Sequence, residues 1–285
     1  MTRPSLRPMT GRASTRLAGR IVLVHGASHG AWCWERLTPL LERLGLQVQA
    51  LDLPGLGADP TPSAEITFEN YVDRVVEALH ASPVATLLVG HSLGGITISQ
   101  AAEQAPQQVA KLVYLAAFLP RDGESAARAG FGEMPESAGR AMRASSVEGA
   151  HEFDPALAAD VFYNKCDPDV AQWAVRHLRP QANAPASATV RLSAERWGTI
   201  PKVYVRCTQD RALPPEYQRW LCERAPDVRE RVMDTDHSPF LSDPEGLAAR
   251  HVSDNADTRT GRPTPEWGDP PSVQLTRKTA GRGGA

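Results

Sequence analysis

A serine set among glycines is the first pattern in this chain that could do chemistry. Ser92 lies in the G-x-S-x-G stretch 90–94, after the aliphatic run 85–89 and before a segment with helical spacing. At a sharp strand-to-helix turn, glycines relieve the crowded backbone, and the serine hydroxyl is raised at a helix N-terminus, where negative charge is favoured. We therefore predict that Ser92 is a nucleophile.

A serine hydroxyl needs a base to become a nucleophile. Of the eight histidines, His237 is the best placed, because it follows the last predicted strand and precedes a helix. A side chain in such a loop could reach across the strand ends. His91 adjoins Ser92, so we expect its ring to point away from the serine. His237 is therefore the predicted base.

The base in turn needs a carboxylate that holds its tautomer and stabilises its cation. Asp210 follows the strand predicted at 203–205 and is the expected partner of His237. Asp236 competes for this role, but it adjoins His237, which makes the side-chain hydrogen bond awkward. Asp234 and, more remotely, Asp52 remain as substitutes.

Reaction at an ester or amide carbonyl also requires hydrogen-bond donors for the oxyanion. The backbone N–H of Leu93, the residue after the nucleophile, is one expected donor. The loop that follows the first strand should supply the other. Gly26 allows a close approach of the backbone there, so we predict the N–H of Ala27.

Elements that alternate along residues 21–250 must bring these groups together. Aliphatic and β-branched runs predict strands at 21–24, 48–51, 85–89, 111–116, 203–205 and 232–233. Apolar residues between several of these runs recur at i, i+3, i+4 and i+7, as in amphipathic helices. This alternation predicts an α/β fold, a mostly parallel sheet with helices on both faces. Ligands of such sheets bind beyond the carboxyl ends of the strands, which every candidate residue follows.

Three stretches depart from this alternation of strands and helices. Residues 121–198 are Ala-rich and punctuated by prolines, and they predict an inserted helical cap over the strand ends. Residues 1–20 carry five arginines without an apolar run. We expect a disordered N-terminal extension or an over-long start, with an organelle-targeting segment as the alternative. Residues 251–285 are poor in large apolar side chains and are predicted to be a disordered tail.

The composition of the 285 residues excludes several classes of protein. A net charge of -2 argues against a nucleic-acid partner, and no run approaches the ~18 apolar residues of a membrane span. Without a secretory signal, we expect a cytoplasmic protein. The cysteines are scattered without metal-ligand spacing, so reduced thiols and neither a metal nor a cofactor are expected. Oligomeric state stays open, a homodimer included. The cysteines are Cys33, Cys166, Cys207 and Cys222.

Four motifs in this order resemble one subfamily of the α/β-hydrolases, which contains plant methylesterases, hydroxynitrile lyases and bacterial esterases. The motifs are His25-Gly26-Ala27-Ser28-His29-Gly30-Ala31-Trp32-Cys33-Trp34, Gly90-His91-Ser92-Leu93-Gly94-Gly95, Cys207-Thr208-Gln209-Asp210-Arg211-Ala212-Leu213-Pro214 and Asp236-His237-Ser238-Pro239-Phe240-Leu241. The resemblance implies an α/β-hydrolase fold, no cofactor, and small-molecule esters with small apolar parts as substrates. It implies Ser92 as nucleophile, His237 as base and Asp210 as orienting acid, with oxyanion N–H groups from Ala27 and Leu93.

Two departures from this subfamily bear on the reaction. Its lyases carry a lysine after the catalytic histidine and a threonine in the oxyanion loop, where this chain has Ser238 and Ala27. Both favour ester hydrolysis through an acyl-enzyme over cyanohydrin cleavage. Another reaction on the same triad stays open, such as hydroxynitrile lysis, C–C cleavage or biosynthetic acyl transfer. So does a weakly catalytic ligand-binding receptor.

Overall fold

The structure is a computed structural model that describes residues 19–126 and 136–249. Most of the predicted extension 1–20 and the predicted tail 251–285 lie outside the described residues. The first strand begins at Gly19, so the last two residues of that predicted extension belong to the sheet.

Six parallel strands form the main sheet in the order β2-β1-β3-β4-β8-β9. Each strand expected from an apolar run is present. The central strand β3 is buried along its whole length, as an uninterrupted apolar run predicts for a strand covered on both faces. The strands are β1 Gly19–Val24, β2 Leu46–Leu51, β3 Thr86–His91, β4 Val109–Leu115, β8 Lys202–Cys207 and β9 Val228–Met233.

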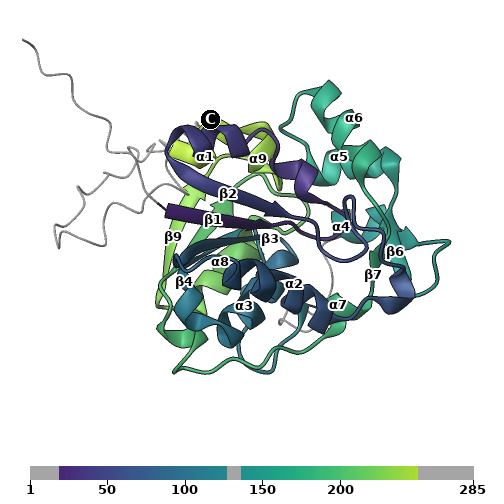
Figure 1. Cartoon of the computed structure of the whole chain (residues 1–285). Coiled ribbons are helices and arrows are strands. Elements are labelled where there is room, and N and C mark those ends of the chain that lie inside the picture. Colours follow the sequence, from purple (N-terminus) through teal and green to yellow (C-terminus); the bar gives the residue numbers. More distant parts are fainter. Residues whose placement is uncertain (1–18, 127–135, 250–285) are drawn as a thin grey trace, which may run out of the picture.

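Helices cover both faces of this sheet (Figure 1). One core layer packs under α2, α3 and α8, and the other under α1, α9 and α10. The helices are α1 Thr38–Arg43, α2 Phe68–His80, α3 Gly94–Gln104, α8 Pro215–Glu223, α9 Pro239–Ser242 and α10 Pro244–Leu247, with single 3-10 turns at Ala31–Trp34, Ser63–Glu65, Pro106–Gln108 and Trp197–Thr199. Because each layer excludes water from one face, the sheet is a rigid platform for its loops.

Local sequence sets where several helices begin and end. Thr67 accepts a hydrogen bond from the Asn70 N–H, and the Asn70 side chain bonds back to the Thr67 N–H, which forms a capping box at the start of α2. After α1, Gly45 has a φ of 90° and donates to the Glu42 carbonyl. Glycine adopts this left-handed conformation without a steric penalty, so Gly45 ends the helix.

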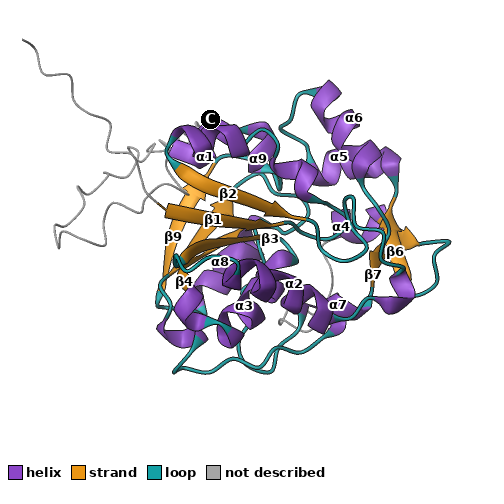
Figure 2. Ribbon diagram, viewed as in Figure 1, coloured by secondary structure: helices purple, strands orange, loops and turns teal. Residues whose placement is uncertain are grey.

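Between β4 and β8 the chain leaves the sheet and lies over the carboxyl ends of β1 and β2 (Figure 2). Helices occur there, as expected of a cap. The structure adds a three-stranded antiparallel sheet that the sequence did not predict, because strands of two to four residues are too short to show a period. The elements are α4 Glu136–Ala141, β5 Met142–Ala144, β6 Ala150–Phe153, α5 Pro155–Phe162, α6 Pro168–His177, β7 Gln181–Ala182 and α7 Ala184–Ser187. The limits 121–198 for the cap stay a prediction.

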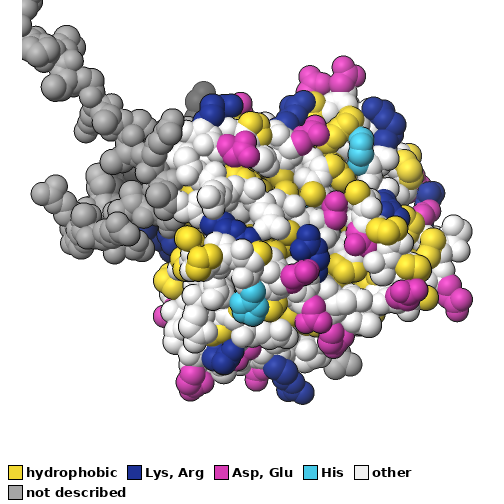
Figure 3. Space-filling model, in the orientation of Figure 1, with side chains coloured by type: hydrophobic (Ala, Val, Ile, Leu, Met, Phe, Trp, Pro, Cys, Tyr) yellow, Lys and Arg dark blue, Asp and Glu magenta, His cyan; other side chains and the backbone are white. Residues whose placement is uncertain are grey.

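The surface and the cysteines complete the description. On the face shown in Figure 3, acidic and basic side chains of the described residues are interspersed. No helix within 19–126 and 136–249 is long and apolar enough to cross a membrane. All four cysteines are free, and Cys33, Cys207 and Cys222 are buried.

Candidate active site

Ser92 lies at the turn from β3 to α3, in a strained backbone conformation. Its φ is 51°, a left-handed value that non-glycine residues rarely adopt. The turn is held by its own carbonyl, which accepts hydrogen bonds from the N–H groups of Gly95 and Phe118. The structure therefore has the strand–turn–helix context that the sequence motif requires.

Glycines around this turn are required by close contacts. A Cβ on Gly26 would lie 2.7 Å from the Ser92 Cβ, and one on Gly94 would lie 2.6 Å from the His25 carbonyl oxygen. On Gly95 it would lie 2.1 Å from the Phe118 carbonyl oxygen. The loops after β1 and β4 can therefore approach the serine only because these residues have no side chain.

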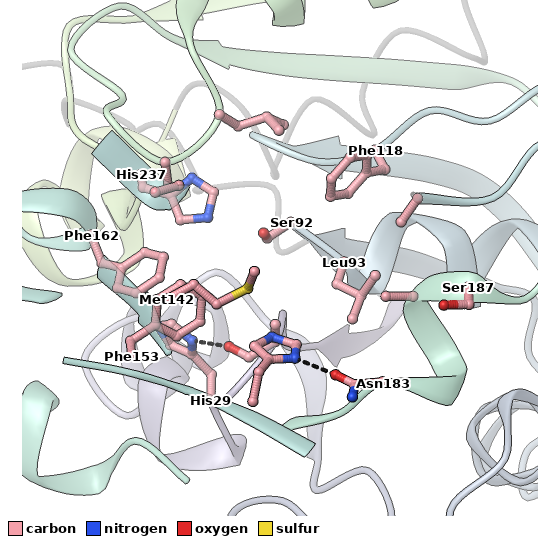
Figure 4. A pocket seen from close by; sticks show the side chains of 17 residues that line it. His29, Ser92, Leu93, Phe118, Met142, Phe153, Phe162, Asn183, Ser187 and His237 are labelled. Carbon is pink, nitrogen blue, oxygen red and sulfur yellow. Dashed lines mark hydrogen bonds between the residues drawn. The ribbon is translucent and has the colours of Figure 1, made fainter. Parts of the chain in front are cut away.

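His237 and Asp210 form a buried pair beside Ser92. Nδ1 of His237 lies 2.7 Å from Oδ2 of Asp210, and both residues are almost fully buried. Because a carboxylate only accepts, Nδ1 carries the proton and Nε2 keeps its lone pair. Figure 4 shows the Ser92 hydroxyl pointing toward the His237 ring. No hydrogen bond joins them among the described residues, as is common in ligand-free sites, where such contacts tighten on binding.

The Asp210 carboxylate is oriented by three further donors. Oδ1 accepts from the N–H groups of Ala212 and Leu213, and Oδ2 accepts from Nε2 of Gln218 at 2.8 Å. Gln218 is fully buried on α8, between the buried residues Tyr217 and Leu221. Sequence reasoning missed Gln218, although an amide on the apolar face of a helix was the available signal.

The competing aspartates face other partners. Oδ2 of Asp236 accepts from the Lys165 N–H at 2.9 Å, and Oδ1 from the Ser238 N–H and the Ser242 hydroxyl. Asp234 bonds to the side chains of Thr208 and Gln209, and the Thr208 hydrogen bond lowers the pKa of Asp234. Asp52 accepts from backbone N–H groups near β2. Asp210 is therefore the aspartate that the structure brings to His237.

His91 is not among the residues that line the cavity at Ser92, and its ring holds the loop of the predicted base. Its Nε2 lies 2.9 Å from the His237 carbonyl oxygen, and the two rings are 4.5 Å apart. The Nε2 atom must donate, because a carbonyl only accepts. Sequence reasoning did not assign this role, because nothing local connects two residues 146 positions apart.

The two predicted oxyanion donors lie beside Ser92. Ala27 and Leu93 both line the pocket, and neither N–H donates to another group of the described residues. Nδ1 of His25 lies 2.8 Å from the Gly26 carbonyl oxygen, and Nε2 of His25 accepts from the Leu53 N–H. A trans peptide points its C=O and N–H in opposite directions, so this contact turns the Ala27 N–H away from the His25 ring.

These buried histidines remain uncharged near neutral pH. Burial lowers the pKa of His25 to about 4 and that of His29 to about 3, although hydrogen bonds to the Gly26 and Ala27 carbonyls oppose the shift. Burial also holds the pKa of His91 well below its ordinary value. A neutral ring has one donor and one acceptor nitrogen, so each can orient a backbone group.

A mostly apolar cavity of about 330 Å³ opens at Ser92. In Figure 4, Phe162, Met142 and Phe153 lie on the His237 side, and Phe118 and Ser187 on the other. No Lys, Arg, Asp or Glu occurs among its described lining residues, and the described part of the chain holds no group of three or more potential metal ligands. The lining comprises Ala27, His29, Ser92, Leu93, Phe118, Ala126, Ala138, Met142, His151, Phe153, Phe162, Asn183, Ala186, Ser187, Ala212, Leu213 and His237.

Comparison with known proteins extends over most of the chain. Residues 21–250 match the model of the alpha/beta hydrolase family. Methylesterase 7 of Arabidopsis thaliana is 33% identical over 246 residues, covering 81% of this chain and 94% of the relative. Salicylic acid-binding protein 2 of Nicotiana tabacum is 33% identical over 244 residues, covering 80% and 94%.

Two solved structures show the same architecture. A pyrethroid hydrolase from Sphingobium faniae superposes with a TM-score of 0.73 at 27% identity, covering 81% of this chain and 94% of that structure. Polyneuridine aldehyde esterase superposes with a TM-score of 0.72 at 26% identity, covering 81% and 96%.

Proposed function

The chain belongs to the alpha/beta hydrolase family and is an ester hydrolase, and within that activity we propose that Ser92 is the nucleophile, His237 the general base and Asp210 its orienting acid. The observation that carries this assignment is the buried 2.7 Å contact between Nδ1 of His237 and Asp210. It leaves the Nε2 lone pair on the side of the ring that faces the strained serine turn.

In the proposed mechanism, the Ser92 oxygen attacks the ester carbonyl carbon while Nε2 of His237 takes the hydroxyl proton. The N–H groups of Ala27 and Leu93 stabilise the negative oxygen of the tetrahedral intermediate. His237 then gives its proton to the departing alkoxide. The alcohol diffuses away, and Ser92 remains acylated. A water molecule, deprotonated by His237, then attacks the acyl carbonyl. The second tetrahedral intermediate collapses as His237 returns this proton to the Ser92 oxygen, which restores the serine hydroxyl and releases the acid.

The lining supports an uncharged, small or medium apolar ester as the substrate. Apolar side chains dominate the described wall, and a charged substrate group would lose hydration there without gaining an ion-pair partner. Methylesterases and esterases predominate among the relatives, so the alternative reactions on the same triad are not favoured. The position of a lyase lysine is taken by Ser238, which is buried.

A panel of p-nitrophenyl esters, methyl esters and cyanohydrins tests this proposal, with Ser92→Ala as the control. We expect ester turnover that falls on the order of 10⁴-fold or more in the variant, and a serine-directed phosphonate that adds one label at Ser92. Full activity in Ser92→Ala, or labelling elsewhere, contradicts the assignment. Cyanide release with poor ester turnover would favour the lyase alternative.

The location in the cell is a separate proposal. We propose that the enzyme is cytoplasmic, a compartment in which its four free cysteines would stay reduced. Immunodetection after cell fractionation tests it, and recovery outside the cytoplasmic fraction would contradict it.

A further inference from the structure

We propose that His29 and Tyr163 form a positioning pair through which the cap holds the oxyanion loop in its catalytic conformation. The proposal rests on the assignment of the Ala27 N–H as an oxyanion donor. Tyr163 directly follows α5 of the cap, and His29 lies two residues after Ala27, 134 positions earlier in the chain. Neither side chain is used in the proton transfers described above.

The hydrogen bonds of His29 run in one direction. Nδ1 lies 2.7 Å from the Ala27 carbonyl oxygen, and Nε2 lies 2.8 Å from the Tyr163 hydroxyl. Because the carbonyl only accepts, Nδ1 carries the hydrogen, and the Tyr163 hydroxyl must donate to Nε2. Both residues are 1% exposed, so water cannot replace either partner without a rearrangement.

The peptide between Ala27 and Ser28 is held at both ends by such contacts. Its carbonyl is bound by His29, and its N–H, on Ser28, donates to Oε1 of Gln181 at 3.1 Å. The Ser28 carbonyl accepts from the Arg179 N–H, and Ser28 has a φ of 63°. The Ala27–Ser28 peptide and the Gly26–Ala27 peptide, which carries the proposed oxyanion N–H, meet at the Cα of Ala27. A rotation of the first peptide would therefore also turn the second.

The residues after Tyr163 attach the cap to the loops of the other proposed catalytic residues. Nδ2 of Asn164 donates to the Gln209 carbonyl at 3.1 Å, next to Asp210. The Lys165 N–H donates to Asp236 at 2.9 Å, next to His237. Segment 163–165 thus contacts three loops, those of Ala27, Asp210 and His237. Asn164 and Lys165 fix the segment to the loops of Asp210 and His237, and Tyr163 orients the loop of Ala27.

The charge state of the pair suits this role. Burial lowers the pKa of His29 to about 3 and raises the pKa of the Tyr163 hydroxyl well above its ordinary value. Both groups are therefore uncharged at neutral pH, and the direction of their hydrogen bonds does not change there.

Two amide variants of His29 distinguish the roles of its two ring nitrogens. In His29→Asn the side-chain NH₂ can lie where Nδ1 lies, so it keeps a donor for the Ala27 carbonyl. In His29→Gln the amide reaches to the position of Nε2 and faces Tyr163 instead. We expect His29→Asn, which breaks the link to Tyr163, to lose about three- to tenfold in kcat, as Tyr163→Phe should. His29→Gln, which loses the contact with the Ala27 carbonyl itself, should lose about three- to tenfold more, each step on the scale of one hydrogen bond. Equal kcat values for the two variants would overturn the proposal.

Tyr163→Phe removes only the hydroxyl of the pair. We expect kcat to fall about three- to tenfold with KM changed less than about twofold. The Ki of a small arylboronic acid, which becomes tetrahedral on Ser92, should rise by the same factor. Tyr114→Phe is the matched control, since Tyr114 is fully buried and its hydroxyl bonds to Ser99 and Trp197 away from the pocket. It should lower the melting temperature and leave the boronate Ki unchanged.

An unchanged boronate Ki in a folded Tyr163→Phe enzyme would overturn the proposal. If that variant does not fold, the comparison of the His29 amides decides. A third measurement needs neither a variant nor activity: ¹⁵N NMR of the parent enzyme at pH 7 should show His29 protonated at Nδ1. The opposite tautomer would overturn the proposal. Full activity in Ser92→Ala would instead refute the proposed function, so the two failures are distinguishable.

Discussion

The loops of the main sheet and the cap contribute different kinds of side chains to the same cavity. The loops supply Ser92, Asp210 and His237, and the Asp210–His237 pair is joined by a short buried hydrogen bond. The cap supplies chiefly Ala138, Met142, Phe153 and Phe162, which touch the cavity with apolar surface. The first region is constrained by directional contacts, and the second by packing.

This difference separates chemistry from selectivity. Polar groups on a rigid sheet hold the geometry that bond-making requires, whereas apolar walls discriminate by volume. Segment 163–165 is where the two regions meet through hydrogen bonds. Substitutions in the loops should therefore change the rate or the fold, and substitutions in the cap wall should change substrate preference.

The largest effect is expected for Asp210→Asn. The amide cannot hold His237 in its tautomer or stabilise its cation, so kcat should fall about 10⁴-fold. Asp236→Asn should cost less than about tenfold in kcat, because the Asp236 carboxylate bonds to Lys165, Ser238 and Ser242 rather than to the ring. Ester hydrolysis by both purified variants measures this. If Asp236→Asn loses most of kcat while Asp210→Asn keeps it, Asp236 is the orienting acid.

A glycine-to-alanine substitution should change the free energy of unfolding in opposite directions in two helices. Gly95→Ala in α3 places a methyl group 2.1 Å from the Phe118 carbonyl oxygen, so stability should fall by about 3 kcal/mol. Gly139→Ala in α4 of the cap meets none of the described residues within 4 Å and should stabilise by up to about 1 kcal/mol. Urea unfolding of both variants provides the comparison. A Gly95→Ala protein as stable as the parent would show that the turn can relax.

The buried histidines of the loops should make stability depend on pH. The pKa of His25 is about 4 and that of His29 about 3 in the folded protein, whereas unfolded histidines titrate near 6.5. The unfolded chain therefore binds protons first. Stability is fully present above pH 6.5 and should fall as the pH drops, by about 1 kcal/mol per buried histidine between pH 6.5 and 5.5.

Denaturant unfolding at pH 7.5, 6.5, 6.0 and 5.5 measures this slope. His80→Gln, at an exposed residue of α2, is the control and should leave the slope unchanged. A free energy of unfolding that stays constant over this interval would contradict this, because it would mean that these rings take up protons in the folded protein as readily as in the unfolded chain.

The smallest effect is expected in the cap wall. Met142→Ala enlarges the cavity, so the ratio of kcat/KM for a bulky over a small acyl ester should rise about tenfold. Val147→Ala, at an exposed cap residue, is the control and should leave this ratio unchanged. If instead Met142→Ala lowers kcat equally for all esters, the cap wall takes part in positioning the reaction.

Much of the fold could be predicted because its signals are local. Apolar runs located every strand of the main sheet, and helical periods indicated amphipathic helices between several of them. The cap was harder to predict. Its strands β5, β6 and β7 have two to four residues each, and their pairing depends on contacts between segments rather than on a repeating pattern.

For the site, the sequence by itself determined the serine turn, the candidate base and acid, and their order along the chain, because each follows a strand in a recognisable loop. Only the tertiary structure decided which aspartate faces His237, and that His91, His29 and Gln218 orient the groups around it. The physical reason is distance along the chain. His29 meets Tyr163 across 134 positions and His91 meets His237 across 146, and such contacts exist only once the sheet and the cap have packed.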